Sequence, residues 1–149
     1  MERTVQIASE AEMLALGNRL GKRLKGGSFA ALYGDRGAGK SVLARGVGAA
    51  LGVTRLTSPT FTIVQEYPTT PPLFHFDAYR LADEDELYAI GFSDYLRADG
   101  IVLMEWANLV PGALPKERLE IRIAGAGNAV RFVTLIPHGT DYEELVDTL

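Results

Sequence analysis

The chain has 149 residues, 47% of them hydrophobic and 23% charged, and this composition predicts one domain over residues 1–149 that buries a core. The formal net charge of −4 argues against direct nucleic-acid binding, which usually requires a basic face. The absence of cysteine excludes disulfides, thiolate nucleophiles and cysteine-based metal sites. The sequence has neither a secretory signal nor an apolar run of about 20 residues, so we expect a cytoplasmic protein that does not span a membrane.

The first half of the chain predicts alternating strands and helices. Ser9 and Glu12 form a capping box, S-x-x-E, which marks a helix start because its side chains can satisfy free backbone N–H groups. Apolar residues at helical spacing continue this helix. The elements expected here are a strand at 4–7, a helix from 9 that ends at 26–27, a buried strand at 29–33, and a helix that runs through 51 and stops at Gly52.

The second half predicts mainly strands. The most apolar of them, residues 101–105 (IVLME), is expected at the centre of the sheet. The other elements expected are strands at 61–67 and 73–77, a short helix at 83–90, a closing hairpin of strands at 119–123 and 130–136, and a short helix from 140. Together these elements predict an α/β fold with a mixed sheet, parallel at its centre and antiparallel at one side, and with helices on both faces.

A complete phosphate-binding loop lies between the second strand and its helix. Residues 34–41, GDRGAGKS, match the pattern G-x-x-x-x-G-K-[ST] without a mismatch, which makes the expected fold P-loop NTPase-like. Lys40 is expected to reach the β- and γ-phosphates, and the Ser41 hydroxyl to ligate Mg²⁺. The chain lacks the N-K-x-D motif of guanine binders, so ATP is the expected nucleotide. The loop residues expected to bind it are Asp35, Arg36, Gly37, Ala38, Gly39, Lys40 and Ser41.

Two apolar strands end in carboxylates, at Asp77 and Glu105. Ligands of open α/β sheets bind beyond the carboxyl ends of the strands, so both side chains are expected near the phosphates. One carboxylate can hold the metal, and the other can orient or deprotonate the attacking water. The structural alternative is that each carboxylate caps the segment that follows it. A metal site that adds His75 to these two residues is a less favoured alternative.

Three neighbouring features have both a structural and a functional interpretation. Arg80 is suited either to sensing the γ-phosphate or to pairing with an acid of residues 83–86, and pairing is preferred. Trp106 fits core packing or stacking near the nucleotide. Residues 57–60, TSPT, form either a turn or a switch segment that contacts phosphate and Mg²⁺.

Five segments, taken in order, resemble the TsaE (YjeE) family of bacterial ATPases in the tRNA threonylcarbamoyladenosine (t6A) pathway. They are residues 34–41, 58–61 (SPTF), 75–81 (HFDAYRL), 91–95 (GFSDY) and 105–106 (EW). The resemblance covers residues 5 to about 133. It implies an ATPase that assists modification of the adenosine next to the anticodon by binding the TsaD and TsaB proteins and resetting their complex. Direct tRNA binding by this chain is not expected.

The same resemblance implies individual roles. Lys40 would contact phosphates, Ser41 and Glu105 would hold Mg²⁺, and Asp77 would be needed for hydrolysis. The family also places the start of the first helix near the nucleotide base, which points to residues 9–10 (Ser9 and Glu10).

The chain departs from the family at two loop positions. Ser41 stands where Thr is usual, which keeps the hydroxyl, and Arg36 stands where an apolar residue is common and is suited to phosphate or to a partner. Residues beyond Pro137 lie outside the family motifs. A small P-loop kinase and a binding module whose nucleotide only gates docking stay open as alternatives.

Overall fold

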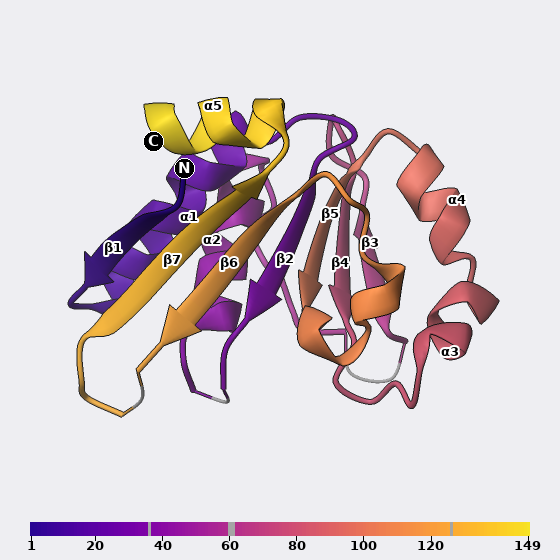
Figure 1. The fold of residues 1–149 in the computed structure, drawn as a ribbon, viewed down its shortest axis with the longest axis horizontal. Helices are drawn as coiled ribbons and strands as arrows, with labels where there is room; N and C mark the ends of the chain where they lie inside the picture. The colour runs from indigo at the N-terminus through magenta and orange to yellow at the C-terminus, as the bar shows by residue number, and fades with distance from the viewer. Residues whose placement is uncertain (36, 60–61, 126) are drawn as a thin grey trace.

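The computed structural model describes residues 1–35, 37–59, 62–125 and 127–149 (Figure 1). The strands of the described residues are β1 (Arg3–Ile7), β2 (Phe29–Tyr33), β3 (Val64–Tyr67), β4 (Leu73–Asp77), β5 (Ile101–Glu105), β6 (Arg118–Ala124) and β7 (Arg131–His138). The helices are α1 (Glu10–Arg23), α2 (Lys40–Ala50), α3 (Glu84–Ala89), α4 (Phe92–Arg97) and α5 (Thr140–Thr148), with short 3₁₀ turns at Ala107–Leu109 and Pro111–Ala113. In this part of the chain, no helix is long and apolar enough to cross a membrane.

All of these strands join one mixed sheet in the order β1-β7-β6-β2-β5-β4-β3. The central pairs β6–β2, β2–β5 and β5–β4 are parallel, which confirms the expected parallel centre. Antiparallel strands lie at both edges, β3 beside β4 and the β7–β1 pair beside β6, whereas the sequence analysis placed them at one side. The difference arises because β2 and β5 lie between β6 and β4, so the two antiparallel pairs β3–β4 and β6–β7 fall at opposite edges, an order that no local sequence pattern indicates.

The sheet separates two apolar layers, and helices cover both faces as expected. Alternate residues of β2 point in opposite directions, so Ala30 and Leu32 pack in the layer of α1 and α2. Phe29, Ala31 and Tyr33 pack in the layer that contains Leu87 of α3 and Phe92 of α4. Figure 1 shows α1 and α2 behind the sheet, and α3 and α4 beside its β3 edge.

Two elements differ clearly from the sequence prediction, beyond shifts of a few residues at other ends. Helix α4 was not predicted, because six residues are too few to show a helical period. Its Phe92 packs edge-on against Phe76 of β4, with ring centroids 5.4 Å apart. Strand β3 begins at Val64 rather than at residue 61, and Ile63 just before it has a positive φ of 69°. Residues 60–61 of the predicted strand lie outside the described residues.

Helices α1 and α2 approach closely through glycines. A Cβ atom added at Gly17 of α1 would lie 2.3 Å from the Leu43 carbonyl oxygen of α2. A Cβ at Gly46 of α2 would lie 2.3 Å from the Leu14 carbonyl oxygen of α1. No real side chain fits at such distances, so the two glycines fix how near the helices lie. Because α2 starts with Lys40, this packing also positions the phosphate-binding loop.

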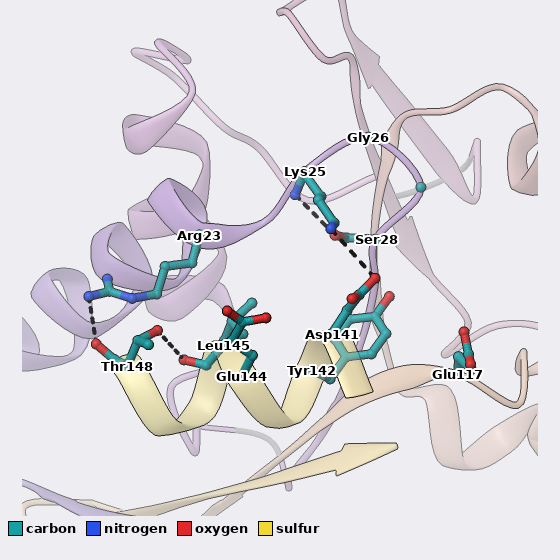
Figure 2. A pocket seen from close by; sticks show the side chains of 11 residues that line it. Arg23, Lys25, Gly26, Ser28, Glu117, Asp141, Tyr142, Glu144, Leu145 and Thr148 are labelled. Atoms are coloured by element: carbon teal, nitrogen blue, oxygen red, sulfur yellow. Dashed lines mark hydrogen bonds and ion pairs between the residues drawn. The ribbon is translucent and has the colours of Figure 1, made fainter. Parts of the chain in front are cut away.

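The segment beyond Pro137, which the motifs left unassigned, closes the end of the sheet where β2 begins. The Tyr142 hydroxyl of α5 accepts a 2.8 Å hydrogen bond from the Phe29 N–H, and both groups are buried. Arg3 and Arg23 donate to the Leu149 and Thr148 carbonyl oxygens at 2.6 and 2.9 Å, where cations suit the helix dipole. Figure 2 shows the cavity of about 410 Å³ between α1 and α5.

A charged cluster lies on the side of β6 that faces away from α1 and α2. Glu120 is 6% exposed, and its carboxylate accepts hydrogen bonds from Arg122 at 2.5 Å and pairs with His138 at 2.9 Å. Burial alone would raise the pKa of Glu120, but the hydrogen bonds from His138 and Arg122 outweigh it and hold the pKa below its usual 4.5. The ionised carboxylate therefore stabilises the folded state.

We expect Gly17→Ala to lower the free energy of unfolding by about 2 kcal/mol, because its new methyl group meets backbone that can move only with the helix. Gly48→Ala in α2 is the matched control. Its Cβ meets the end of the Leu56 side chain at 2.8 Å, which can rotate away, so the effect should stay near zero. Urea unfolding measures both variants, and equal stabilities would contradict the glycine contact.

We expect Glu120→Gln to cost about 1.5 to 3 kcal/mol at pH 7, the usual contribution of a hydrogen bond to a charged group. A folded-state pKa below the unfolded value stabilises above pH 4.5, and this contribution disappears as pH falls through the lower folded pKa. The difference between the wild type and the variant should therefore shrink in urea unfolding at pH 3. Glu2→Gln, at an exposed position, serves as control. A difference that does not change with pH would refute the assignment.

Candidate functional site

The phosphate-binding loop lies where β2 ends and α2 begins. Gly37 and Gly39 have φ values of 77° and 115°, in the left-handed region that glycine adopts without strain. Gly39 caps α2 without any side-chain hydrogen bond to the first helical turn. The first helical backbone bond runs from the Leu43 N–H to the Gly39 oxygen, so the N–H groups before Leu43 can meet an anion. Arg36 lies outside the described residues.

Lys40 bends back over the loop with its side chain buried. Its Nζ donates to the carbonyl oxygens of Gly34 and Asp35, the second at 2.9 Å, and lies 4.2 Å from the centre of the Trp106 ring. Burial lowers the pKa of the Lys40 ammonium, and the charges of Glu105, Asp35 and Asp77 oppose this shift. An anion bound beside Lys40 would favour its charged form further.

The two strand-end carboxylates face Lys40. Asp77 and Glu105 are direct partners in the parallel β4–β5 register. Strand alternation places both on the α2 side of the sheet. Asp77 Oδ1 accepts a 2.9 Å hydrogen bond from the Tyr79 N–H, so it also caps the turn that follows β4. Burial raises the pKa of Asp77, and the nearby Glu105 raises it further.

One cavity of about 670 Å³ joins these groups, a size typical of ligand sites. It opens between the loop, the ends of β4 and β5, and the segment before β3. Its polar and charged lining residues are Lys40, Ser41, Ser58, Asp77, Arg80 and Glu105. The structure thus brings Lys40, Ser41, Asp77 and Glu105 around one space.

Aromatic side chains form one wall of this cavity. Trp106 has a positive φ of 59° and is only partly buried, and it packs against the apolar layer of α3 and α4 while it also lines the cavity. Its ring lies 4.9 Å from that of Tyr79. Ser58 and Pro59 of the 57–60 segment line the same cavity, whereas Thr60 lies outside the described residues.

His75 lies behind Glu105. Its Nε2 is 2.7 Å from Glu105 Oε2, and its side chain is fully buried. Among the described residues, no group of three or more His, Asp or Glu side chains is arranged to hold a metal ion. The three-residue metal site with Asp77 that the sequence left as an alternative is therefore not formed.

A second cavity, of about 400 Å³, adjoins the loop at Gly37–Gly39 and reaches the start of α1. Ser9 and Glu10 line it, as the family resemblance implies for the base side of the site. Both side chains also have local partners. The Ser9 hydroxyl accepts from the Glu12 N–H at 3.1 Å, and Glu10 pairs with Arg45 at 3.0 Å.

Arg131, at the start of β7, is a site residue that the sequence analysis missed. Its Nε donates to the Ala38 carbonyl oxygen at 3.0 Å, and its Nη2 donates to the Gly37 carbonyl oxygen at 3.1 Å. These bonds tie the start of β7 to the phosphate-binding loop. No sequence pattern indicates the contact, because 93 residues separate Arg131 from Ala38.

The strand–loop–helix unit and the cavity at its mouth define the class: a P-loop nucleotide-binding protein, compatible with ATP. The family described as "Threonylcarbamoyl adenosine biosynthesis protein TsaE" matches residues 7–133. The chain therefore belongs to the TsaE family, as the sequence resemblance indicated.

Individual relatives and a solved structure support the same family assignment. The chain is 43% identical over 127 residues to the tRNA threonylcarbamoyladenosine biosynthesis protein TsaE of Bacillus subtilis strain 168, covering 84% of this chain and 79% of the relative. It is 40% identical over 132 residues to the TsaE protein of Streptomyces coelicolor, covering 83% and 88%. The crystal structure of Bacillus subtilis YdiB superposes with a TM-score of 0.86 and 33% identity, covering 99% of this chain and 93% of that one.

We expect Mg-ATP at a hundredfold excess over its Kd to raise the free energy of unfolding by about 2.7 kcal/mol. Lys40→Ala should remove most of this gain, because Lys40 lies buried beside the loop that would hold the phosphates. Thermal unfolding with and without Mg-ATP measures the gain. Lys25→Ala changes an exposed lysine at the cavity between α1 and α5, and this variant should keep the full gain. An undiminished gain in the Lys40 variant would rule out this site.

Proposed function

We propose that this chain is the ATP-binding and ATP-hydrolysing component of t6A biosynthesis, with residues 1–149 acting as a single P-loop domain. The observation that carries the proposal is the convergence of Lys40, Ser41, Asp77 and Glu105 on the cavity at the phosphate-binding loop. Membership of the TsaE family supports the pathway. The buried cation and the uncapped start of α2 support a polyphosphate ligand.

The residues of the site divide into phosphate-binding and metal-binding roles. The loop from Asp35 to Lys40, with Arg36, Gly37, Ala38 and Gly39, would hold the phosphates, and Ser9 and Glu10 would lie near the base. Ser41 and Glu105 would hold Mg²⁺, and their hydroxyl and carboxylate oxygens fit the hard-ligand preference of this ion. When bound, Mg²⁺ supplies charge neutralisation at the phosphate oxygens.

Asp77 is the residue we assign to the attacking water. Its Oδ1 is held by the Tyr79 N–H, which leaves Oδ2 to orient a water molecule or to take its proton. Burial raises its pKa and so makes the carboxylate a better proton acceptor than an exposed aspartate. Glu105, opposite Asp77 in the register, keeps a separate role at the metal.

The biological role we propose is to reset a complex of TsaD and TsaB proteins between turnovers, in the cytoplasm and without membrane attachment. Hydrolysis would change the state of the partner complex rather than act on tRNA directly. The net charge of −4 supports a chain that faces protein partners instead of the phosphate backbone of RNA. The family name supports the pathway in which these partners work.

We expect Glu105→Gln to slow phosphate release at least 100-fold, because an amide oxygen cannot replace a carboxylate at the metal. Phosphate release is measured for the chain alone and with TsaD and TsaB proteins, which should accelerate the wild type. Glu117→Gln, at an exposed position, should behave as wild type. Normal turnover in the Glu105 variant would remove it from the mechanism. Phosphate transfer to a small molecule would favour a kinase, and no release under any condition would favour a nucleotide-gated binding module.

A further inference from the structure

The His75–Glu105 pair is a buried polar contact beside the cavity. His75 is 0% exposed and Glu105 is 4% exposed, and Nε2 and Oε2 are 2.7 Å apart. His75 is paired with Leu103 in the β4–β5 register, two positions before the pair formed by Asp77 and Glu105. The imidazole therefore approaches the carboxylate from the interior of the protein.

The pair gives the two oxygens of Glu105 different surroundings. Glu105 lines the nucleotide cavity, and His75 is absent from the described lining of that cavity. The hydrogen bond with His75 engages Oε2. The carboxylate is thus anchored at its inner oxygen, and Oε1 is the oxygen left for a ligand in the cavity.

The buried histidine has no comparable second contact. His75 Nδ1 is buried and has no hydrogen-bond partner among the described residues. An unpaired buried nitrogen costs stability, and an apolar side chain at this position of β4 would avoid that cost. Among the described residues, the hydrogen bond between Nε2 and Glu105 is therefore the one polar contact of the ring.

We propose that His75 is a positioning residue that fixes the Glu105 side chain so that Oε1 faces Mg²⁺ bound with nucleotide. This inference rests on the proposed function, in which Glu105 helps to hold the metal. A glutamate side chain has several rotatable bonds, and a fixed donor behind it removes that freedom before the ligand arrives. Partners that hydrogen-bond metal-binding side chains in this way set ligand orientation.

The test compares His75→Leu, which removes the donor, with His75→Gln, whose amide nitrogen can reach the position of Nε2. Calorimetry measures the affinity for a non-hydrolysable ATP analogue with and without Mg²⁺. We expect the Leu variant to lose 10- to 100-fold of the affinity that Mg²⁺ adds, with little change in Mg²⁺-free binding. The Gln variant should recover most of the loss.

The chain supplies a control in its other histidine–glutamate pair, in which Glu120 is buried and His138 is partly exposed. His138→Leu breaks the 2.9 Å contact with Glu120, away from the nucleotide cavity, and should leave Mg²⁺-dependent binding unchanged. If the Leu variant of His75 unfolds in a thermal scan, His75→Asn replaces it, because its shorter amide cannot reach Glu105. A Glu105→Gln background should abolish the difference between the His75 variants.

The outcomes separate the positioning role from the proposed function. If wild type fails to bind the analogue under any condition, the proposed function fails. If wild type binds with a Mg²⁺-dependent gain and the Leu or Asn variant of His75 keeps that gain in full, the positioning role is refuted. Equal losses in the Gln and Leu variants would also refute it, because a role limited to packing predicts no rescue by a restored donor.

Discussion

The parallel pairing of β2, β5 and β4 is the constraint on which the rest of the structure depends. Parallel neighbours end at the same edge of a sheet, so this pairing brings the phosphate-binding loop and two strand-end carboxylates together. The register then places Asp77 directly opposite Glu105. The contact between Gly17 and Gly46 completes the arrangement, because it holds α2 and its first residues over the same edge.

The charged side chains of the site affect one another's pKa. Burial disfavours the cation of Lys40 and the anion of Asp77, and each of these charges partly offsets the penalty on the other. Lys40 meets carbonyl oxygens of its own loop, and Glu105 meets His75. Each charged group thus has a protein partner of its own, and the cavity between them is lined by charges of both signs.

Sequence reasoning found most of the local elements and missed the long-range contacts that no motif or strand end marks. The strands β2, β4 and β5 were predicted with their observed ends, because each is an apolar run followed by a loop or a strand-end carboxylate. The motif and the strand ends also led to the cavity residues. The pairing of β1 with β7, the contact of Arg131 with the loop and the bond between His75 and Glu105 stayed out of reach, because tertiary packing alone creates them.

The hydrogen bonds from Arg131 show that the phosphate-binding loop depends on a distant part of the chain. A guanidinium on β7 donates to the carbonyl oxygens of Gly37 and Ala38 and so ties the loop to a distant strand, while the Ala38 N–H donates to the Asp35 carbonyl oxygen within the loop. A fragment that stopped before residue 131 would still contain all eight letters of the motif. It would lack the strand that braces the loop, so the geometry of the loop depends on nearly the full length of the polypeptide and is not a modular property of its signature.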